Sequence, residues 1–274
     1  MPRLHFSTAP FFRHPLREAF RHVAAGGYSS LEVMVTQDPA SQEPHLLLSL
    51  AEDHGVSIEV IHAPMLLFTR RVWGTDPVGK IYRAVQVAQE VGASIVVAHP
   101  PYRWQVRYQR WIETSLAELS ARTGVTVAVE NMFPVRVRER GLRFHAAQGQ
   151  EDLAAYPHLV FDTSHAAVAG LDILEAAHRY RDNLVHVHAS NNAGKGWDSH
   201  LPVYEGVLPM EEFLRTLREN GYAGDVSIEL DLRPYFDDED ELQKVLAANR
   251  EFCQEHLGLR AAGDRARATV RAAD

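Results

Sequence analysis

The segment Ser94–Glu130, SIVVAHPPYRWQVRYQRWIETSLAELSARTGVTVAVE, decides the fold class of this chain. It opens with an uninterrupted apolar run, continues through residues 105–123 with the period of an amphipathic helix, and closes, after Gly124, on a second apolar run. Strands that are apolar throughout are typical of a parallel sheet covered on both faces. A glycine at the end of a helical stretch fits the left-handed residue that terminates many helices. The segment therefore predicts a strand–helix–strand unit.

The same unit recurs along the chain, because short β-branched runs alternate with stretches of helical period. The expected strands are Arg3–Ser7, Ser30–Val35, Ser57–His62, Ser94–His99, Val125–Glu130, His158–Asp162, Asn183–His188 and Asp225–Leu230. Helices are expected near 15–26, 43–54, 76–92, 105–123, 150–156, 171–181, 209–220 and 238–256. Eight such repeats predict an α/β fold, a single-domain (β/α)₈ TIM barrel over residues 1–257. Residues 258–274 are rich in Ala and Arg without apolar periodicity, so we expect a disordered tail.

Composition excludes several kinds of site and several classes of protein. The chain has 274 residues and one cysteine, Cys253, which excludes an intramolecular disulfide and a zinc site built from cysteines. Neither a secretory leader nor an apolar run of membrane-spanning length is visible, so we expect a cytoplasmic protein without a membrane partner. The formal net charge of −8 argues against a main role in holding nucleic acid, although a locally basic cleft stays open.

Ionisable residues fall within or at the ends of seven of the expected strands. They are Glu32, His62, His99, Glu130, Asp162, His188 and Glu229. Singly, each could meet solvent or a loop backbone, and a lone histidine could be a satisfied core residue. Together they indicate a cation, since all strand ends of a barrel converge on one mouth and clustered carboxylates repel one another. The loops Met132–Gly149 and Ser190–Val207 should lie on this active face.

These motifs, taken in order, resemble the xylose-isomerase-like barrels, a group that includes sugar phosphate isomerases/epimerases, ketose 3-epimerases and endonuclease IV. The resemblance covers residues 3–256. It is carried by Ile61-His62-Ala63-Pro64, Ala98-His99-Pro100, Val129-Glu130-Asn131-Met132, Phe161-Asp162-Thr163-Ser164-His165, His186-Val187-His188, Asp198-Ser199-His200 and Ser227-Ile228-Glu229-Leu230.

The resemblance to the ketose epimerases implies one divalent metal held by Glu130, Asp162, His188 and Glu229. Three carboxylates and one imidazole suit Mn²⁺, Mg²⁺ or Co²⁺ better than a structural Zn²⁺. His186 shares the inward side of its strand with His188 but lies one layer deeper, so we assign it a supporting or core role.

The implied activity is that of a sugar or sugar phosphate isomerase/epimerase acting on a small carbohydrate. The ion would polarise a carbonyl, and Glu130 and Glu229 would move the proton as an acid/base pair, unless one of them is only a ligand. The resemblance makes His165 a contact of a substrate hydroxyl. Glu32 and His62 could bind distal hydroxyls, with a solvated-loop position as the alternative for Glu32.

One departure puts the substrate in doubt. Where the epimerases carry a substrate-binding arginine after the metal histidine, this chain reads ASNNAGK over residues 189–195. Lys195 could replace the arginine as a point charge, but it lacks the bidentate fork. A homo-oligomer is also compatible with the sequence.

The resemblance leaves a second enzyme class open, an endonuclease IV-like phosphodiesterase acting on abasic DNA. Its three zinc ions would use His62, His99, Glu130, Asp162, His165, His188, Asp198, His200 and Glu229. A non-catalytic barrel of the same family is the third alternative. The acidic net charge, and the absence of the nuclease's Gly- and Gln-containing N-terminal pattern, favour the small-molecule enzyme. A basic aromatic patch for DNA could be formed by Tyr102, Arg103, Trp104 and Arg107, but we interpret these residues as the start of a helix and part of a pocket wall.

Overall fold

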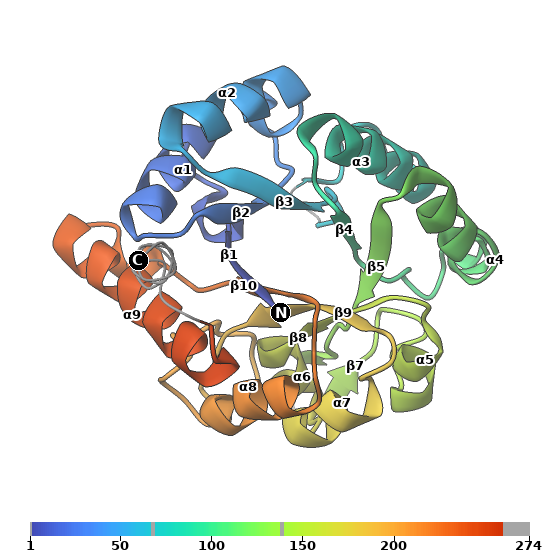
Figure 1. The fold of residues 1–274 in the computed structure, drawn as a ribbon. Coiled ribbons are helices and arrows are strands. Elements are labelled where there is room, and N and C mark those ends of the chain that lie inside the picture. The colour runs from blue at the N-terminus through green and yellow to red at the C-terminus, as the bar shows by residue number, and fades with distance from the viewer. Residues whose placement is uncertain (1, 67–68, 138–139, 260–274) are drawn as a thin grey trace, which may run out of the picture.

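Eight parallel strands close into a barrel in this computed structural model, which describes residues 2–66, 69–137 and 140–259 (Figure 1). The order around the barrel is β1-β10-β9-β8-β5-β4-β3-β2. The strands are β1 Arg3–Ser7, β2 Ser30–Met34, β3 Ser57–His62, β4 Ile95–Ala98, β5 Thr126–Glu130, β8 Leu159–Asp162, β9 Leu184–Ala189 and β10 Asp225–Ile228. The predicted (β/α)₈ architecture is confirmed.

Helices cover the outside of the barrel (Figure 1). They are α1 Leu16–Ala25, α2 Pro44–His54, α3 Pro77–Val91, α4 Val106–Thr123, α5 Gln150–Ala155, α6 Thr163–Ala169, α7 Ile173–Arg179, α8 Met210–Glu219 and α9 Glu239–Leu257. Helices α3 and α4 end where predicted, because Gly92 (φ 80°) and Gly124 (φ 73°) adopt the left-handed conformation that glycine tolerates best.

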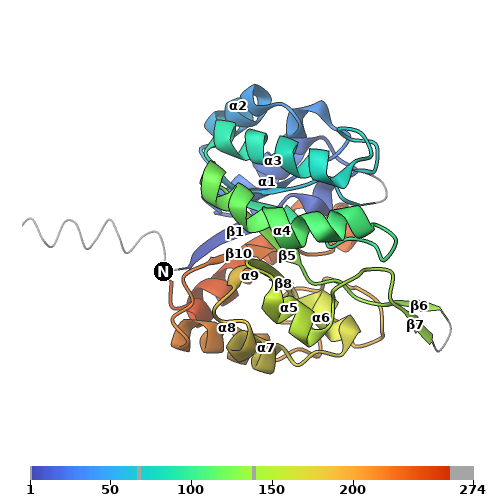
Figure 2. The same cartoon turned by 90° about the vertical axis from the view of Figure 1, so that its right-hand side faces the viewer.

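Two elements of the active face were not expected from the sequence. Helix α6 starts directly after β8, and the Asp162 side chain caps it by accepting a hydrogen bond from the backbone N of His165 at 2.7 Å. The expected loop Met132–Gly149 contains the hairpin β6 Val135–Val137 and β7 Arg140–Leu142, which projects from the barrel on the side away from the N-terminus (Figure 2). Of the expected tail 258–274, residues 260–274 lie outside the described part of the chain.

The interior of the barrel has an apolar half and a polar half. Val60, Ile95, Val97, Ala128 and Val160, from β3, β4, β5 and β8, form a small cluster separate from the main core. The strands on the other side, β1, β2, β9 and β10, contribute His5, Ser7, Glu32, His186 and Ser227, each with no exposed surface. Buried polar groups are costly unless they are paired, so this half needs internal partners.

Candidate metal centre

The strand register brings the predicted site residues together. Asp162 on β8 lies opposite His188 on β9, and His188 lies opposite Ser227 on β10, two residues before Glu229. Glu130 and His62 are the last residues of β5 and β3. The carboxyl ends of these strands therefore point their side chains into one mouth, as predicted.

One group of side chains surrounds the Nδ1 atom of His188. This atom lies 3.1 Å from Glu130 Oε1, 3.8 Å from Asp162 Oδ2 and 3.7 Å from Glu229 Oε2. Glu130, Asp162 and His188 are almost fully buried, whereas 19% of the Glu229 side chain is exposed. Three carboxylates converging on one imidazole nitrogen form a donor set for a divalent cation.

Glu130 also takes part in a second group. Its Oε2 atom lies 3.1 Å from Nε2 of His99 and 3.7 Å from Nε2 of His62. Ligand atoms of these three residues all lie within 4.8 Å of one another, as a common cation would require.

A third group is built around Asp198, whose Oδ2 atom lies 2.8 Å from Nε2 of His200 and 3.3 Å from Nε2 of His165. Ligand atoms of Asp162, His165 and His200 also lie within 4.8 Å of one another. His200 has a positive φ of 39°, an uncommon conformation for a non-glycine residue that often occurs at functional sites.

Backbone carbonyls orient three of these imidazoles. Nδ1 of His62 lies 3.1 Å from the oxygen of Ala63, Nδ1 of His165 2.9 Å from that of Asn131, and Nδ1 of His200 3.2 Å from that of Glu229. A carbonyl only accepts, so each Nδ1 carries the proton and, in the neutral ring, each Nε2 presents its lone pair to the carboxylates. Metal-binding histidines are commonly oriented in this way.

Buried carboxylate oxygens without aligned hydrogen-bond donors in the described part of the chain are a further feature that fits a cation. Glu130 Oε2, Asp162 Oδ2 and Glu229 Oε2 are buried, and no donor among the described residues makes an aligned hydrogen bond to them. Buried carboxylate oxygens without such bonds are unfavourable, and a divalent ion would satisfy them. The residues present therefore fit a metal centre.

The protonation of the site differs between its two glutamates. Burial opposes ionisation of Glu130, but the nearby imidazoles of His188, His62 and His99 outweigh it and hold the pKa of Glu130 well below its usual range. For Glu229, burial dominates and raises the pKa. Although burial alone would lower it, Asp198 and Asp162 raise the pKa of His200 to about 10. A cation bound here would therefore compete with protons for these groups.

Glu32 is buried inside the barrel. Its side chain has no exposed surface and accepts hydrogen bonds from Nε2 of His186 at 2.8 Å and Nε2 of His188 at 3.2 Å. The solvated-loop interpretation is therefore wrong, and the geometry gives no support to a contact with distal substrate hydroxyls. His186 lies one layer below His188, as the strand period predicts.

Lys195 is exposed, and its Nζ atom lies 5.7 Å from the centre of the Trp197 ring. Its role as a substrate contact stays a prediction.

Sequence reasoning assigned no role to Asn131 and Ser164. The Asn131 side chain exchanges two hydrogen bonds with the backbone of Asp162, at 3.0 and 2.6 Å, and Ser164 Oγ donates to Asp198 Oδ1 at 2.6 Å. Both residues therefore position acidic members of the site. Their places directly after Glu130 and two residues after Asp162 were the available signal.

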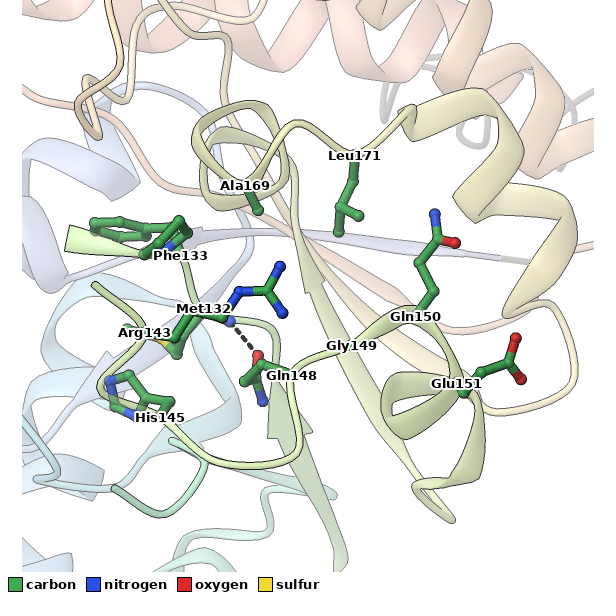
Figure 3. A pocket seen from close by; sticks show the side chains of 11 residues that line it. Met132, Phe133, Arg143, His145, Gln148, Gly149, Gln150, Glu151, Ala169 and Leu171 are labelled. Carbon is green, nitrogen blue, oxygen red and sulfur yellow. Dashed lines mark hydrogen bonds between the residues drawn. The ribbon is translucent and has the colours of Figure 1, made fainter. Parts of the chain in front are cut away.

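Two cavities share Met132, Phe133 and His145 as a common wall, and one of them reaches the centre at His99. The first, here called the aromatic cavity, measures about 500 Å³ and is also lined by His99, Tyr102, Trp104 and Phe144. Tyr102 and Trp104 line this cavity, as predicted, and Arg107 lies in the first turn of α4, whereas Arg103 is not among the lining residues. The second, the outer cavity, measures about 450 Å³. Arg143 points into it, and Gln148 accepts a hydrogen bond from the backbone N of Met132 at 2.6 Å (Figure 3).

Comparisons with known proteins identify relatives of the whole barrel. A family profile described as "Xylose isomerase-like TIM barrel" matches residues 20–254. An uncharacterized protein of Mycobacterium tuberculosis is 34% identical over 270 residues, which cover 92% of this chain and 96% of the relative. Within the described residues, we find no helix that is both long and apolar enough to cross a membrane.

Solved structures of low sequence identity share the fold. A D-tagatose 3-epimerase-like protein superposes with a TM-score of 0.68 at 22% identity, covering 92% of this chain and 98% of its own. A family 2 AP endonuclease from Brucella melitensis gives 0.66 at 18% identity, with coverages of 85% and 94%. The IOLI protein with a bound zinc atom gives 0.68 at 16% identity, with coverages of 95% and 99%.

Proposed function

The chain belongs to the xylose isomerase-like TIM barrel family, and from this premise we propose that it is a divalent-metal-dependent isomerase or epimerase of a small carbohydrate. One observation carries the proposal: Glu130, Asp162 and Glu229 converge on Nδ1 of His188, and the buried Oε2 atom of Glu229 has no aligned donor among the described residues. Such a centre unites a cation site with a carboxylate that can exchange a proton.

A divalent cation held by these four residues would polarise the substrate carbonyl and so acidify the adjacent C–H group. Glu229 is the better placed proton acceptor, because its side chain reaches the open mouth and burial raises its pKa. Glu130 is held by four imidazoles, those of His62, His99, His165 and His188. We therefore assign Glu130 chiefly to holding the cation and orienting the substrate. We assign proton transfer to Glu130 and Glu229 as a pair.

The size of the adjoining space supports a small substrate. The aromatic cavity, about 500 Å³, lies within the usual range for small-molecule sites. The net charge of −8 is unfavourable for binding a nucleic acid backbone. A cytoplasmic location also belongs to this proposal, since a single buried cysteine is compatible with a reducing compartment.

A second candidate function, metal-dependent hydrolysis of a phosphodiester, is favoured by a separate observation. The three ligand groups described above share carboxylates. Glu130 belongs to the first and the second group, and Asp162 belongs to the first and the third. Clustered cations that share carboxylates can clamp the attacking and leaving oxygens of a phosphate ester.

Metal content and turnover test both candidates. We expect mass spectrometry of protein purified without chelator to find about one tightly bound ion per chain, and the protein to convert ketoses without incising abasic DNA. Three zinc ions per chain with incision would establish the second candidate instead. A chain that binds no ion after incubation with Mn²⁺, Co²⁺ or Zn²⁺ would contradict both.

A further inference from the structure

The aromatic cavity reaches the candidate metal centre along two of its residues. His99 lines the cavity while its Nε2 atom lies 3.1 Å from Glu130 Oε2. Phe133 lines it too, and its ring centre lies 4.8 Å from that of His165. Met132, Phe133 and His145 line both this cavity and the outer cavity, and Figure 3 shows them in the wall of the outer cavity. A group that fills the aromatic cavity can therefore belong to a substrate that reacts at the centre.

Flat rings form one side of this cavity. The rings of Tyr102 and Trp104 are parallel within 2° with their centres 4.8 Å apart, and His145 stacks on Tyr102 at 4.5 Å. Trp104 leaves 67% of its surface exposed, and Phe144 leaves 37%. Exposed aromatic rings gathered at a cavity mark a binding surface, because they leave apolar area in water until a ligand covers it.

Of the polar side chains on the wall, Lys80 and Gln105 are held by hydrogen bonds to the backbone, whereas Arg70 and Thr75 also line the cavity. Lys80 Nζ donates to the backbone oxygens of Pro64 at 2.6 Å and Thr69 at 3.0 Å. Gln105 Oε1 accepts from the backbone N of Tyr102 at 2.9 Å. Sugar hydroxyls placed there would exchange their bonds with water for mostly apolar contacts, which is unfavourable, whereas a flat apolar group would gain burial and stacking.

We propose that the aromatic cavity binds a flat apolar substituent carried by the substrate, so that the enzyme acts on an aryl-substituted carbohydrate rather than on a free sugar. This inference rests on the proposed function for the reaction at the metal centre. The cavity itself supplies affinity and selects the substituent, and binding to it can be measured without turnover.

The test compares phenyl and methyl glycosides of glucose, galactose and xylose as probes. Affinities are measured by calorimetry on the metal-loaded full-length protein. Burial and stacking of one phenyl ring predict that at least one phenyl glycoside binds about tenfold or more tightly than its methyl counterpart. Trp104→Ala combined with Phe144→Ala should reduce this preference to within about twofold. Trp197→Ala removes another exposed tryptophan that does not line the cavity, and should keep the preference.

Three outcomes would overturn the proposal: equal affinities within every pair, no measurable binding of any phenyl glycoside, or a preference that persists in the double variant. Failure of the proposed function has a different signature. In that case the phenyl preference and its loss in the double variant remain, but no ion is bound and no probe or ketose is converted.

Discussion

Glu32 on β2 and His188 on β9 lie side by side inside the barrel, with Glu32 Oε1 3.1 Å from Nε2 of His188. The contact leaves Nδ1 of the same ring facing Glu130, Asp162 and Glu229. Burial opposes ionisation of Glu32, but the charge of His188 and the hydrogen bond of His186 outweigh it and hold the pKa of Glu32 well below its usual range. The buried carboxylate thus fixes which nitrogen of His188 is available to a cation.

Glu32→Gln should therefore weaken metal binding. The amide NH₂ of glutamine would take the place of Oε1, which lies 3.1 Å from Nε2 of His188, and two facing donors force that ring to turn or change tautomer. We expect affinity for Mn²⁺ or Co²⁺ to fall about 10–100-fold in calorimetric titrations, and the visible spectrum of bound Co²⁺ to change. Glu59→Gln is the control, because Glu59 pairs with Arg3 and lies outside the metal centre. Unchanged affinity and spectrum in Glu32→Gln would contradict the positioning role.

Glu229→Gln and Glu130→Gln should each leave the barrel folded and lower turnover about 10²–10⁴-fold, because an amide cannot exchange the proton. Because its pKa is raised, Glu229 gains its proton at a higher pH than an ordinary glutamate. As the pH is lowered, wild-type turnover should therefore begin to fall at a pH above the usual pKa range of glutamate. Steady-state rates across pH check this. Near-native rates in both variants would show that neither residue moves the proton.

The Asp198→Ala variant distinguishes a site with one cation from a site with three. In the proposed one-ion site Asp198 lies outside the four ligands, so the variant should keep about one ion per chain while its KM for the substrate rises. Metal analysis of wild type and variant side by side measures the difference. Loss of one of three zinc ions would instead promote the phosphodiesterase, since Asp198 contacts both His165 and His200.

Removal of the ion should destabilise the protein. Without a cation, Glu130, Asp162 and Glu229 repel one another in a buried mouth, and the stabilisation conferred by ligand binding is lost. We expect chelator to lower the melting temperature of the wild type and to have little effect on Asp162→Asn combined with Glu229→Gln. Identical wild-type melting curves with and without chelator would argue against a bound ion.

Acid stability should depend on Asp225, at the opposite end of the barrel from the centre. Burial opposes its ionisation, but hydrogen bonds from His5 and Arg3 lower the pKa of Asp225 from 3.8 to about 2. Because this pKa is depressed, the ionised Asp225 side chain stabilises the fold at pH values above its pKa in the unfolded chain. This stabilisation is lost as the pH falls from about 4 to 2. Between pH 5 and pH 3 the wild type should lose on the order of 1 kcal/mol more unfolding free energy than Asp225→Asn.

Urea titrations at the two pH values measure this difference. Asp182→Asn serves as the control, because the Asp182 side chain is 97% exposed. An equal loss in wild type and Asp225→Asn would show that Asp225 does not govern acid stability.

The sequence by itself determined the barrel and the direction in which its site faces. Apolar runs such as Val125–Glu130 specify strands through local pattern, and a polar residue that ends such a run must lie at the mouth once the strands are parallel. Glu130, Asp162 and His188 were predictable for this reason. The period of two also predicted that His186 lies below His188.

Only the tertiary structure decided how these groups pair. Glu32 and His188 are 156 residues apart, so no local pattern could show that the carboxylate turns inward to hold the ring. Helix α6 and the β6–β7 hairpin lie within segments too short to display a period of their own. The aromatic cavity combines side chains from the segments after β3, β4 and β5, whose proximity follows from closure of the barrel and packing of its loops rather than from their sequence.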